Sequence, residues 1–171
     1  MMNYAPSLII GGRVLSLEAR LQAFSQQYET LAARSILRSA SGSAHVQQRW
    51  RRIKTTLSGS GWVPAGLADL PTAEPLELHC AAARTLQAAG PQIGLPAFRT
   101  DIPPVGYALR QGYRVPVQIS VQNGIAQFTP LTGADAYEVA FWPVLNVFAE
   151  YQDSGDMRNR SYAWSLSCEE I

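Results

Sequence analysis

Residues 115–130, VPVQISVQNGIAQFTP, contain the clearest structural pattern of the chain. Asn123-Gly124 at the centre favours a type I′ turn, because both central residues of that turn need positive φ. A two-residue turn fixes the register, which predicts the facing pairs Val121 with Ala126, Ile119 with Phe128 and Val117 with Pro130. These six residues form one apolar face; the other face is rich in amides and hydroxyls, and Ile125 is its one exception. Such a hairpin belongs to a half-buried antiparallel sheet.

Similar alternation recurs along the chain and predicts strands at 76–81 and 162–169. Residues 8–12, Leu-Ile-Ile-Gly-Gly, look like a short strand that ends in a turn, and further strands are expected from 107 onward. We therefore expect a mainly β fold, an antiparallel β-sandwich or barrel-like domain with irregular loops. The length fits a single β-rich domain over residues 1–171. The Pro/Gly-rich connection at about 84–106 is expected to be an irregular crossing or an exposed loop, and 152–160 a polar loop. The run 137–148 is almost continuously apolar, which predicts burial on both faces or in a subunit contact.

Two segments fit either strand or helix periodicity. Residues 14–28 alternate like a strand, but they also offer a helical apolar face with Ser16 as a possible cap. Residues 46–57 show the same conflict. We favour strands in both and expect a long hairpin at 34–61, with its turn at the serine cluster 39–43.

Composition bounds the function. The chain has 171 residues, of which only 16% are charged, with a net charge of +1. A surface with so few charged residues suits burial against other subunits, although ordinary β domains also have such surfaces. A net charge near zero does not favour a general attraction to nucleic acid or an anionic membrane. The start shows no signal-peptide pattern. The apolar stretch 136–149 is interrupted by Glu138, Pro143 and Asn146 and is too short to span a bilayer. We expect a soluble protein, made in a cytoplasm and not bound to a membrane.

The sequence offers little catalytic equipment. Its two histidines, His45 and His79, lie in different predicted strands, and no ligand pair has the short spacing of a zinc site. Cys80 and Cys168 each continue an alternating apolar set, so we expect buried thiols, although a disulfide stays open if their strands are neighbours. Gly59-Ser60-Gly61 lacks the spacing of a nucleophile elbow. The expectation is no enzyme, no cofactor and no metal.

The strongest local charge feature is the cluster Arg49-Trp50-Arg51-Arg52-Ile53-Lys54. Its cations and its tryptophan could grip phosphates and stack a base, which makes a small nucleic-acid-binding module the alternative function. The cluster could also be a solvated strand, or a patch that meets acidic residues of a neighbouring subunit. As candidate interface residues we take Arg49, Trp50, Arg51 and Arg52, together with Phe141 and Trp142 of the apolar run.

The run from Arg34 to Pro64 and the later segments GADAYEVAFWPVLNVFAEY (133–151) and SYAWSLSCEE (161–170) resemble small tail proteins of siphophages and prophages. The architecture is similar to that of distal tail proteins at the tail–baseplate junction. That resemblance implies a structural subunit without catalysis, in a homo-oligomeric ring, often a hexamer, that joins the tail tube to the hub or fibres. It also implies a place in the virion tail after assembly in the host cytoplasm.

A small hydrolase with dispersed carboxylates is a further alternative.

Overall fold

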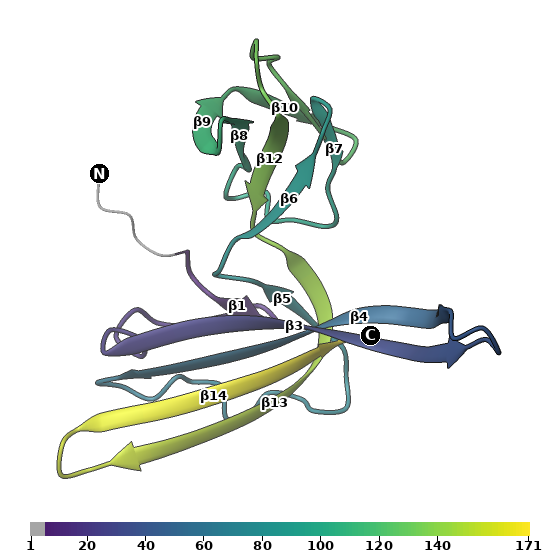
Figure 1. Cartoon of the computed structure of the whole chain (residues 1–171). Helices are drawn as coiled ribbons and strands as arrows, with labels where there is room; N and C mark the ends of the chain where they lie inside the picture. Colours follow the sequence, from purple (N-terminus) through teal and green to yellow (C-terminus); the bar gives the residue numbers. More distant parts are fainter. Residues whose placement is uncertain (1–5) are drawn as a thin grey trace. The chain divides into compact units, whose positions relative to one another are not determined.

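The structure is a computed structural model that describes residues 6–171, and within this range it contains strands and turns but no helix. The strands are β1 (Ile9–Ile10), β2 (Arg13–Val14), β3 (Ala23–Arg38), β4 (Ala44–Gly61), β5 (Leu76–His79), β6 (Arg84–Ala88), β7 (Gln92–Gly94), β8 (Val105–Arg110), β9 (Tyr113–Val117), β10 (Ile119–Gln122), β11 (Ile125–Phe128), β12 (Ala136–Phe141), β13 (Val144–Asp156) and β14 (Ser161–Glu170) (Figure 1). The expected mainly β class is confirmed.

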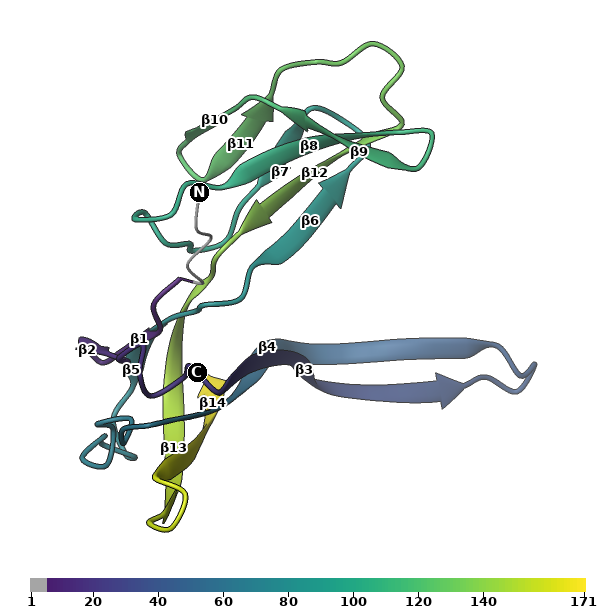
Figure 2. The ribbon, with the colours of Figure 1, turned by 90° about the vertical axis from the view of Figure 1, so that its left-hand side faces the viewer.

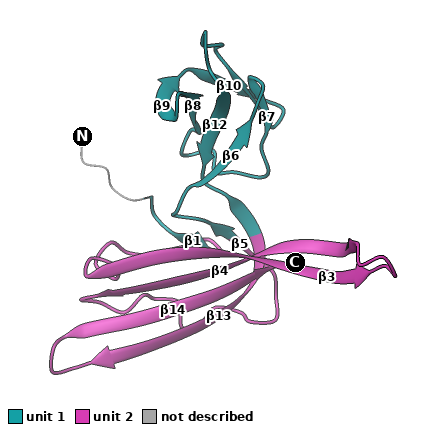
Figure 3. Cartoon of the chain, in the orientation of Figure 1, with its two compact units in different colours: residues 1–10, 78–145 teal, residues 11–77, 146–171 magenta. Residues whose placement is uncertain are grey.

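The chain divides into two compact units (Figure 3). Unit 1 consists of residues 1–10 and 78–145, and unit 2 of residues 11–77 and 146–171. Both units are discontinuous in sequence, because β5 and β13 each begin in one unit and end in the other. The expectation of one domain over 1–171 stays a prediction. The expectation that the chain lacks a signal peptide depends partly on residues 1–5, which lie outside the described residues.

Unit 1 has a sandwich-like core between two antiparallel sheets, with strand orders β6-β12-β8-β9 and β10-β11-β7. Buried side chains from both sheets meet there: Ile93, Ala108, Ala126, Phe128, Tyr137 and Val139. The rings of Phe128 and Tyr137 lie 5.3 Å apart, and the Tyr137 hydroxyl accepts a hydrogen bond from the Leu131 backbone N–H. Only Gln118 separates β9 from β10, so one stretch of chain passes from the first sheet into the second.

The predicted hairpin lies in this unit, and its register is confirmed. Ile119 pairs with Phe128 and Val121 with Ala126, while Asn123 and Gly124 have φ of +51° and +73°, as a type I′ turn requires. The pairing does not extend to Val117 and Pro130. Val117 pairs instead with Gly106 of β8, because the strand changes sheets at Gln118.

Unit 2 contains the long strands of a seven-stranded sheet with the order β2-β1-β5-β13-β14-β4-β3. One face of β13, β14 and β4 is buried, through Val147, Ala149, Leu166, Cys168 and Leu57. Leu67 and Leu70 from the connection after β4 are buried as well. The indole of Trp164 donates to the Ala19 carbonyl oxygen at 2.9 Å, and Gly59 gives this ring its space. The opposite face of the sheet carries exposed polar residues, so one side of it faces solvent.

The ambiguous segments resolve as follows. Residues 46–57 lie in strand β4, as predicted. In 14–28 strand structure is present only at Val14 and from Ala23 onward; residues 15–22 form turns and bends, and the Ser16 hydroxyl caps a turn by accepting from the Ala19 N–H at 3.3 Å.

The structure differs from the expectations for two loops and one apolar run. The connection 84–106 is not irregular throughout, because it contributes β6, β7 and the start of β8 to the sheets of unit 1; residues 95–104 lie outside the named strands, as expected of an irregular crossing. The segment 152–160 is mostly strand, because β13 continues to Asp156 and only 157–160 form the turn. Within its own chain the apolar run 137–148 is not buried on both faces: buried residues alternate with more accessible ones, and Phe148 is 44% exposed. The alternative, that the run lies in a subunit contact, stays a prediction. Within residues 6–171 no helix has the length and apolar character needed to cross a bilayer.

Candidate interaction surface on the β3–β4 hairpin

The most unusual surface of unit 2 is the outer half of the hairpin formed by β3 and β4. The two strands pair antiparallel along their whole length, from Ala23 opposite Ser60 to Arg38 opposite Ala44. Beside them, β14 pairs with β4 only from Lys54 to Gly61. The hairpin therefore continues beyond the sheet as a two-stranded ribbon, visible in Figure 2. We call residues 34–52 the arm.

Local sequence explains why the arm is a hairpin. The turn at Ser39–Ser43 is closed by backbone hydrogen bonds from Ser39 N–H to Ser43 O and from Gly42 N–H to Ser39 O, both 2.9 Å. Gly42 supplies φ of +83°, which a residue with a Cβ rarely adopts. Arg38 donates to the Gly42 carbonyl oxygen at 3.2 Å and ties the turn to the strand. The predicted turn is thus confirmed.

Every residue of the arm is exposed, including its large apolar side chains. Ile36 is 56%, Leu37 51%, Val46 61% and Trp50 49% exposed. Ile36 and Leu37 are adjacent on one strand and so point to opposite faces, which leaves both faces of the arm apolar in part. An isolated two-stranded hairpin is at best marginally stable in water. Exposed apolar groups on such an element are typical of a contact surface.

Charge is also unevenly distributed. The arm carries five arginines, Arg34, Arg38, Arg49, Arg51 and Arg52, and no acidic residue. The chain has 14 basic and 13 acidic residues, so nine basic and 13 acidic ones remain outside the arm. The arm is thus formally +5 and the rest of the chain −4, although the whole chain is nearly neutral.

A β-bulge lies near the base of the arm. Ala33 pairs with Trp50 and Arg34 with Gln48, so Arg49 has no residue opposite it. An extra residue in one strand bends it and increases its twist. Arg52, at the base of the arm, donates to the Ile171 carbonyl oxygen at 2.6 Å.

A row of acidic side chains crosses the solvent face of the sheet near this base. Glu29 lies opposite Lys54, Lys54 opposite Glu169, and Glu169 opposite Phe148. Glu150 is two residues from Phe148 and therefore shares its face. Lys54 Nζ lies 3.1 Å from Glu169 Oε1, and this hydrogen bond, with the nearby carboxylates, raises the pKa of the lysine. We call Glu29, Phe148, Glu150 and Glu169 the acidic row.

The predicted interface residues separate into two groups. Arg49, Trp50, Arg51 and Arg52 lie together, exposed, on β4. Phe141 does not belong to a surface: it is 2% exposed, buried in its own chain as an inward-facing residue of β12. Its place among interface candidates is therefore corrected. Trp142 is half-buried, and its indole N–H donates to the Ala81 carbonyl oxygen at 3.1 Å.

The exposed residues of β3 in the arm were not among the predicted interface residues. Arg34, Ile36, Leu37 and Arg38 are as exposed as the predicted cluster, and Ile36 lies directly opposite Val46. The predicted turn at 39–43 could have indicated them, because pairing the two strands that flank this turn brings these residues together.

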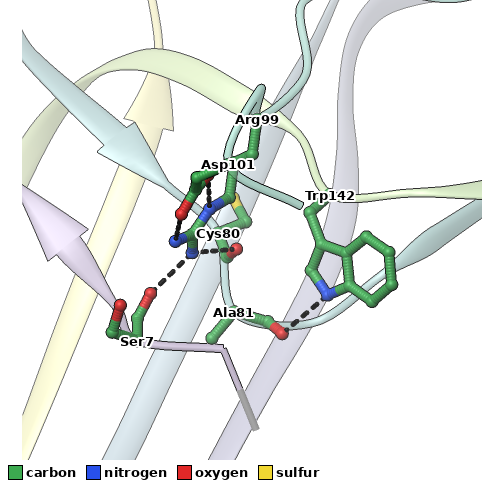
Figure 4. Close-up of polar contacts among 6 residues, drawn as sticks. All are labelled: Ser7, Cys80, Ala81, Arg99, Asp101 and Trp142. Atoms are coloured by element: carbon green, nitrogen blue, oxygen red, sulfur yellow. Dashed lines mark hydrogen bonds and ion pairs between the residues drawn. The ribbon is translucent and has the colours of Figure 1, made fainter. Parts of the chain in front are cut away.

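A buried arginine in unit 1 was also not predicted. Arg99 is 1% exposed, and its guanidinium donates to both carboxylate oxygens of Asp101 and to the carbonyl oxygens of Ser7 and Cys80, at 2.5–3.1 Å (Figure 4). Arg99 lowers the pKa of the Asp101 carboxyl, chiefly through these hydrogen bonds. Each of the three guanidinium nitrogens donates to a protein group, so the arrangement joins chain segments. No sequence motif announces it, because Arg99 lies in the presumed loop.

The other residues with chemical potential are scattered. His45 lies on the arm and His79 in β5, and among residues 6–171 no group of three or more His, Cys, Asp or Glu side chains could hold a metal ion. Cys80 and Cys168 are both buried and form no disulfide, as the favoured alternative predicted. Asp156 caps its turn by accepting from the N–H groups of Arg158 and Asn159.

Comparison with known proteins adds no identification. No protein-family model matches this chain, and searches of curated proteins and of solved structures found no match either.

Proposed function

We propose that this protein is a non-enzymatic structural subunit of a phage tail tip or baseplate. In this proposal copies of the chain form a ring, hexameric by analogy with distal tail proteins, that joins the tail tube to the hub or fibres. The protein is assembled in the host cytoplasm and resides in the virion tail. It needs no cofactor.

One observation carries the proposal: the arm is exposed on both faces and still presents Ile36, Leu37, Val46 and Trp50 to solvent. Burying such side chains against another protein is favourable by roughly 25 cal/mol per Å² of apolar surface. A protruding hairpin that lacks a third strand is a common means of joining subunits, since its free edges can also accept a strand. The resemblance of segments 34–64 and 133–170 to tail proteins supplies the biological setting.

Electron microscopy of the purified protein and of phage particles tests this function. We expect closed rings in negative stain and the same chain in purified tails, detected by mass spectrometry of the particles. A strictly monomeric protein that is absent from virions would refute the proposal.

A nucleic-acid-binding module remains the second candidate, because Trp50 is 49% exposed and lies among arginines on β4. Stacking on an aromatic ring and contacts to phosphates would give a salt-dependent affinity for single strands. A gel-shift titration with single-stranded DNA tests it. Binding that survives the double substitution Arg51→Glu and Arg52→Glu would argue against this use of the arm.

A further inference from the structure

One face of the arm has a defined chemical pattern. Arg34, Ile36 and Arg38 alternate along β3 and so share a face, and Val46 lies opposite Ile36 on that face. Arg51 lies opposite Ala32, two residues before Arg34, which places Arg51 on the same face. This arm face consists of three guanidinium groups around two exposed aliphatic side chains.

The acidic row has the complementary pattern. Two carboxylates, from Glu150 and Glu169, flank Phe148, which is 44% exposed, and the third, from Glu29, lies at the far end of the row on β3, beyond Lys54. Phe148, Glu150, Glu169 and Lys54 line a shallow hollow in the sheet surface together with Ser167 and Thr72. With Lys54 included, the formal charge of the row is −2. Arginine pairs well with carboxylates, because its planar donor fork matches their two oxygens.

The arm face cannot reach the acidic row of its own chain. Ile36, at the centre of the arm face, lies seven residues from Glu29 on the same strand, which corresponds to about 23 Å along it, although Arg51 at the base of the arm lies nearer. Glu29 and Ile36 also lie on opposite faces of β3, because successive side chains of a strand alternate between its faces and these two residues are an odd number of positions apart. A second copy of the chain satisfies both requirements, because it presents an acidic row of its own.

We propose that the arm face of one copy docks on the acidic row of a second copy. The five arm-face residues are Arg34, Ile36, Arg38, Val46 and Arg51. The two patches differ, so the contact is head-to-tail, and repeated contacts of this kind close into a ring when the rotation permits. This inference rests on the proposed self-assembling function and identifies the surfaces that such assembly would use. The unequal charges, +5 on the arm and −4 elsewhere, favour this partner over a nucleic acid, since the acidic body would repel phosphates.

A charge-swap experiment on the full chain tests the docking. The arm variant is Arg34→Glu with Arg51→Glu, and the row variant is Glu29→Lys with Glu150→Lys; these four side chains are exposed and outside the core. Sedimentation velocity over a concentration series, at low and high salt, measures assembly. The control, Arg110→Glu with Arg158→Glu, reverses the same number of charges at exposed positions elsewhere.

The expected results are specific to this contact. Each variant alone should associate at least about tenfold more weakly than the wild type, because like charges then face one another. An equimolar mixture should assemble again: the glutamate arm of one variant fits the lysine row of the other, and the unchanged arm fits the unchanged row. The control should assemble like the wild type, and wild-type association should weaken as salt is raised.

Failure of the inference and failure of the proposed function give different results. If the wild type assembles and both variants assemble equally well, the docking surfaces are wrong while self-assembly stands. If the wild type stays monomeric at every concentration and salt, both are wrong. A monomer whose retention of single-stranded DNA depends on Arg34 and Arg51 would instead assign the arm to nucleic acid.

Discussion

The substitution Arg99→Met tests whether the buried arginine holds unit 1 together. Its guanidinium makes four hydrogen bonds, two to the Asp101 carboxylate and one each to the carbonyl oxygens of Ser7 and Cys80. Methionine keeps much of the apolar stem and packs adaptably, so the change removes mainly the polar contacts. The two carbonyl oxygens then lose a charged donor in a place where the arginine side chain is only 1% exposed.

The magnitude follows from the burial of each partner. A buried acceptor that loses its donor costs about 1–3 kcal/mol. Asp101 contributes less, because its side chain is 55% exposed and water replaces the arginine there. We therefore expect a loss of about 3 kcal/mol in the free energy of unfolding, most of it from the carbonyl oxygens of Cys80 and Ser7. That is a large share of the free energy of unfolding of a native protein, which is typically about 5–15 kcal/mol.

Urea unfolding followed by circular dichroism measures the loss as a lower midpoint at unchanged slope. Hydrogen exchange assigns the loss to unit 1: the amides of residue 99 and Val144, which bond to the carbonyls of Trp142 and Ala97, should exchange faster together with the other interior amides of that unit. Arg110→Met, at an exposed position, is the matched control and should stay within about 0.5 kcal/mol. A loss below about 1 kcal/mol for Arg99→Met would refute the reasoning.

Three further substitutions test the packing and the pH response. Gly59→Ala would place a Cβ 2.6 Å from the Trp164 ring, so we expect a loss of about 1–3 kcal/mol and a lower melting temperature; an unchanged melting temperature would contradict this close packing. Gly106→Ala would place its Cβ 2.1 Å from the Ile119 side chain, so we expect a lower free energy of unfolding. This loss should shrink when Ile119→Ala is added, which a double-mutant cycle of urea unfolding measures. Strict additivity of the two substitutions would count against the contact. The pKa of Asp101 is lowered in the folded chain, so its stabilisation is present above its unfolded pKa of about 4 and disappears as pH falls through the folded value. Asp101→Asn should therefore flatten the acid loss of stability, and parallel stability curves for the variant and the wild type between neutral and acid pH would oppose this.

Local signals predicted the parts of the fold that depend on near neighbours. Asn123-Gly124 specified its turn and the pairing of Ile119 with Phe128, because a two-residue turn leaves no freedom of register. The serine cluster likewise predicted the turn at the tip of the arm. The segment 84–106 was misjudged in part, since its glycines and prolines separate short strands whose partners, β11 and β12, lie far along the chain.

The candidate surface was only half predicted for a related reason. The arginines around Trp50 stand out in the sequence, but Ile36 and Arg38 become part of the same surface only through cross-strand pairing. Phe141 failed as an interface residue because apolar alternation specifies a buried face without saying whether its own chain or another covers it. Arg99 could not be recognised, since tertiary structure brings its partners Ser7 and Cys80 to it, and the nearby Asp101 alone does not indicate a buried arginine.

The passage of one stretch of chain through both sheets of unit 1 has a thermodynamic consequence. Detaching β9 from β8 would pull β10 away from β11 through Gln118, and loss of either sheet would uncover the apolar groups of the other. Neither sheet can melt while its companion survives. Unit 1 should accordingly behave as one cooperative block, whose interior amides all exchange at a common, globally limited rate.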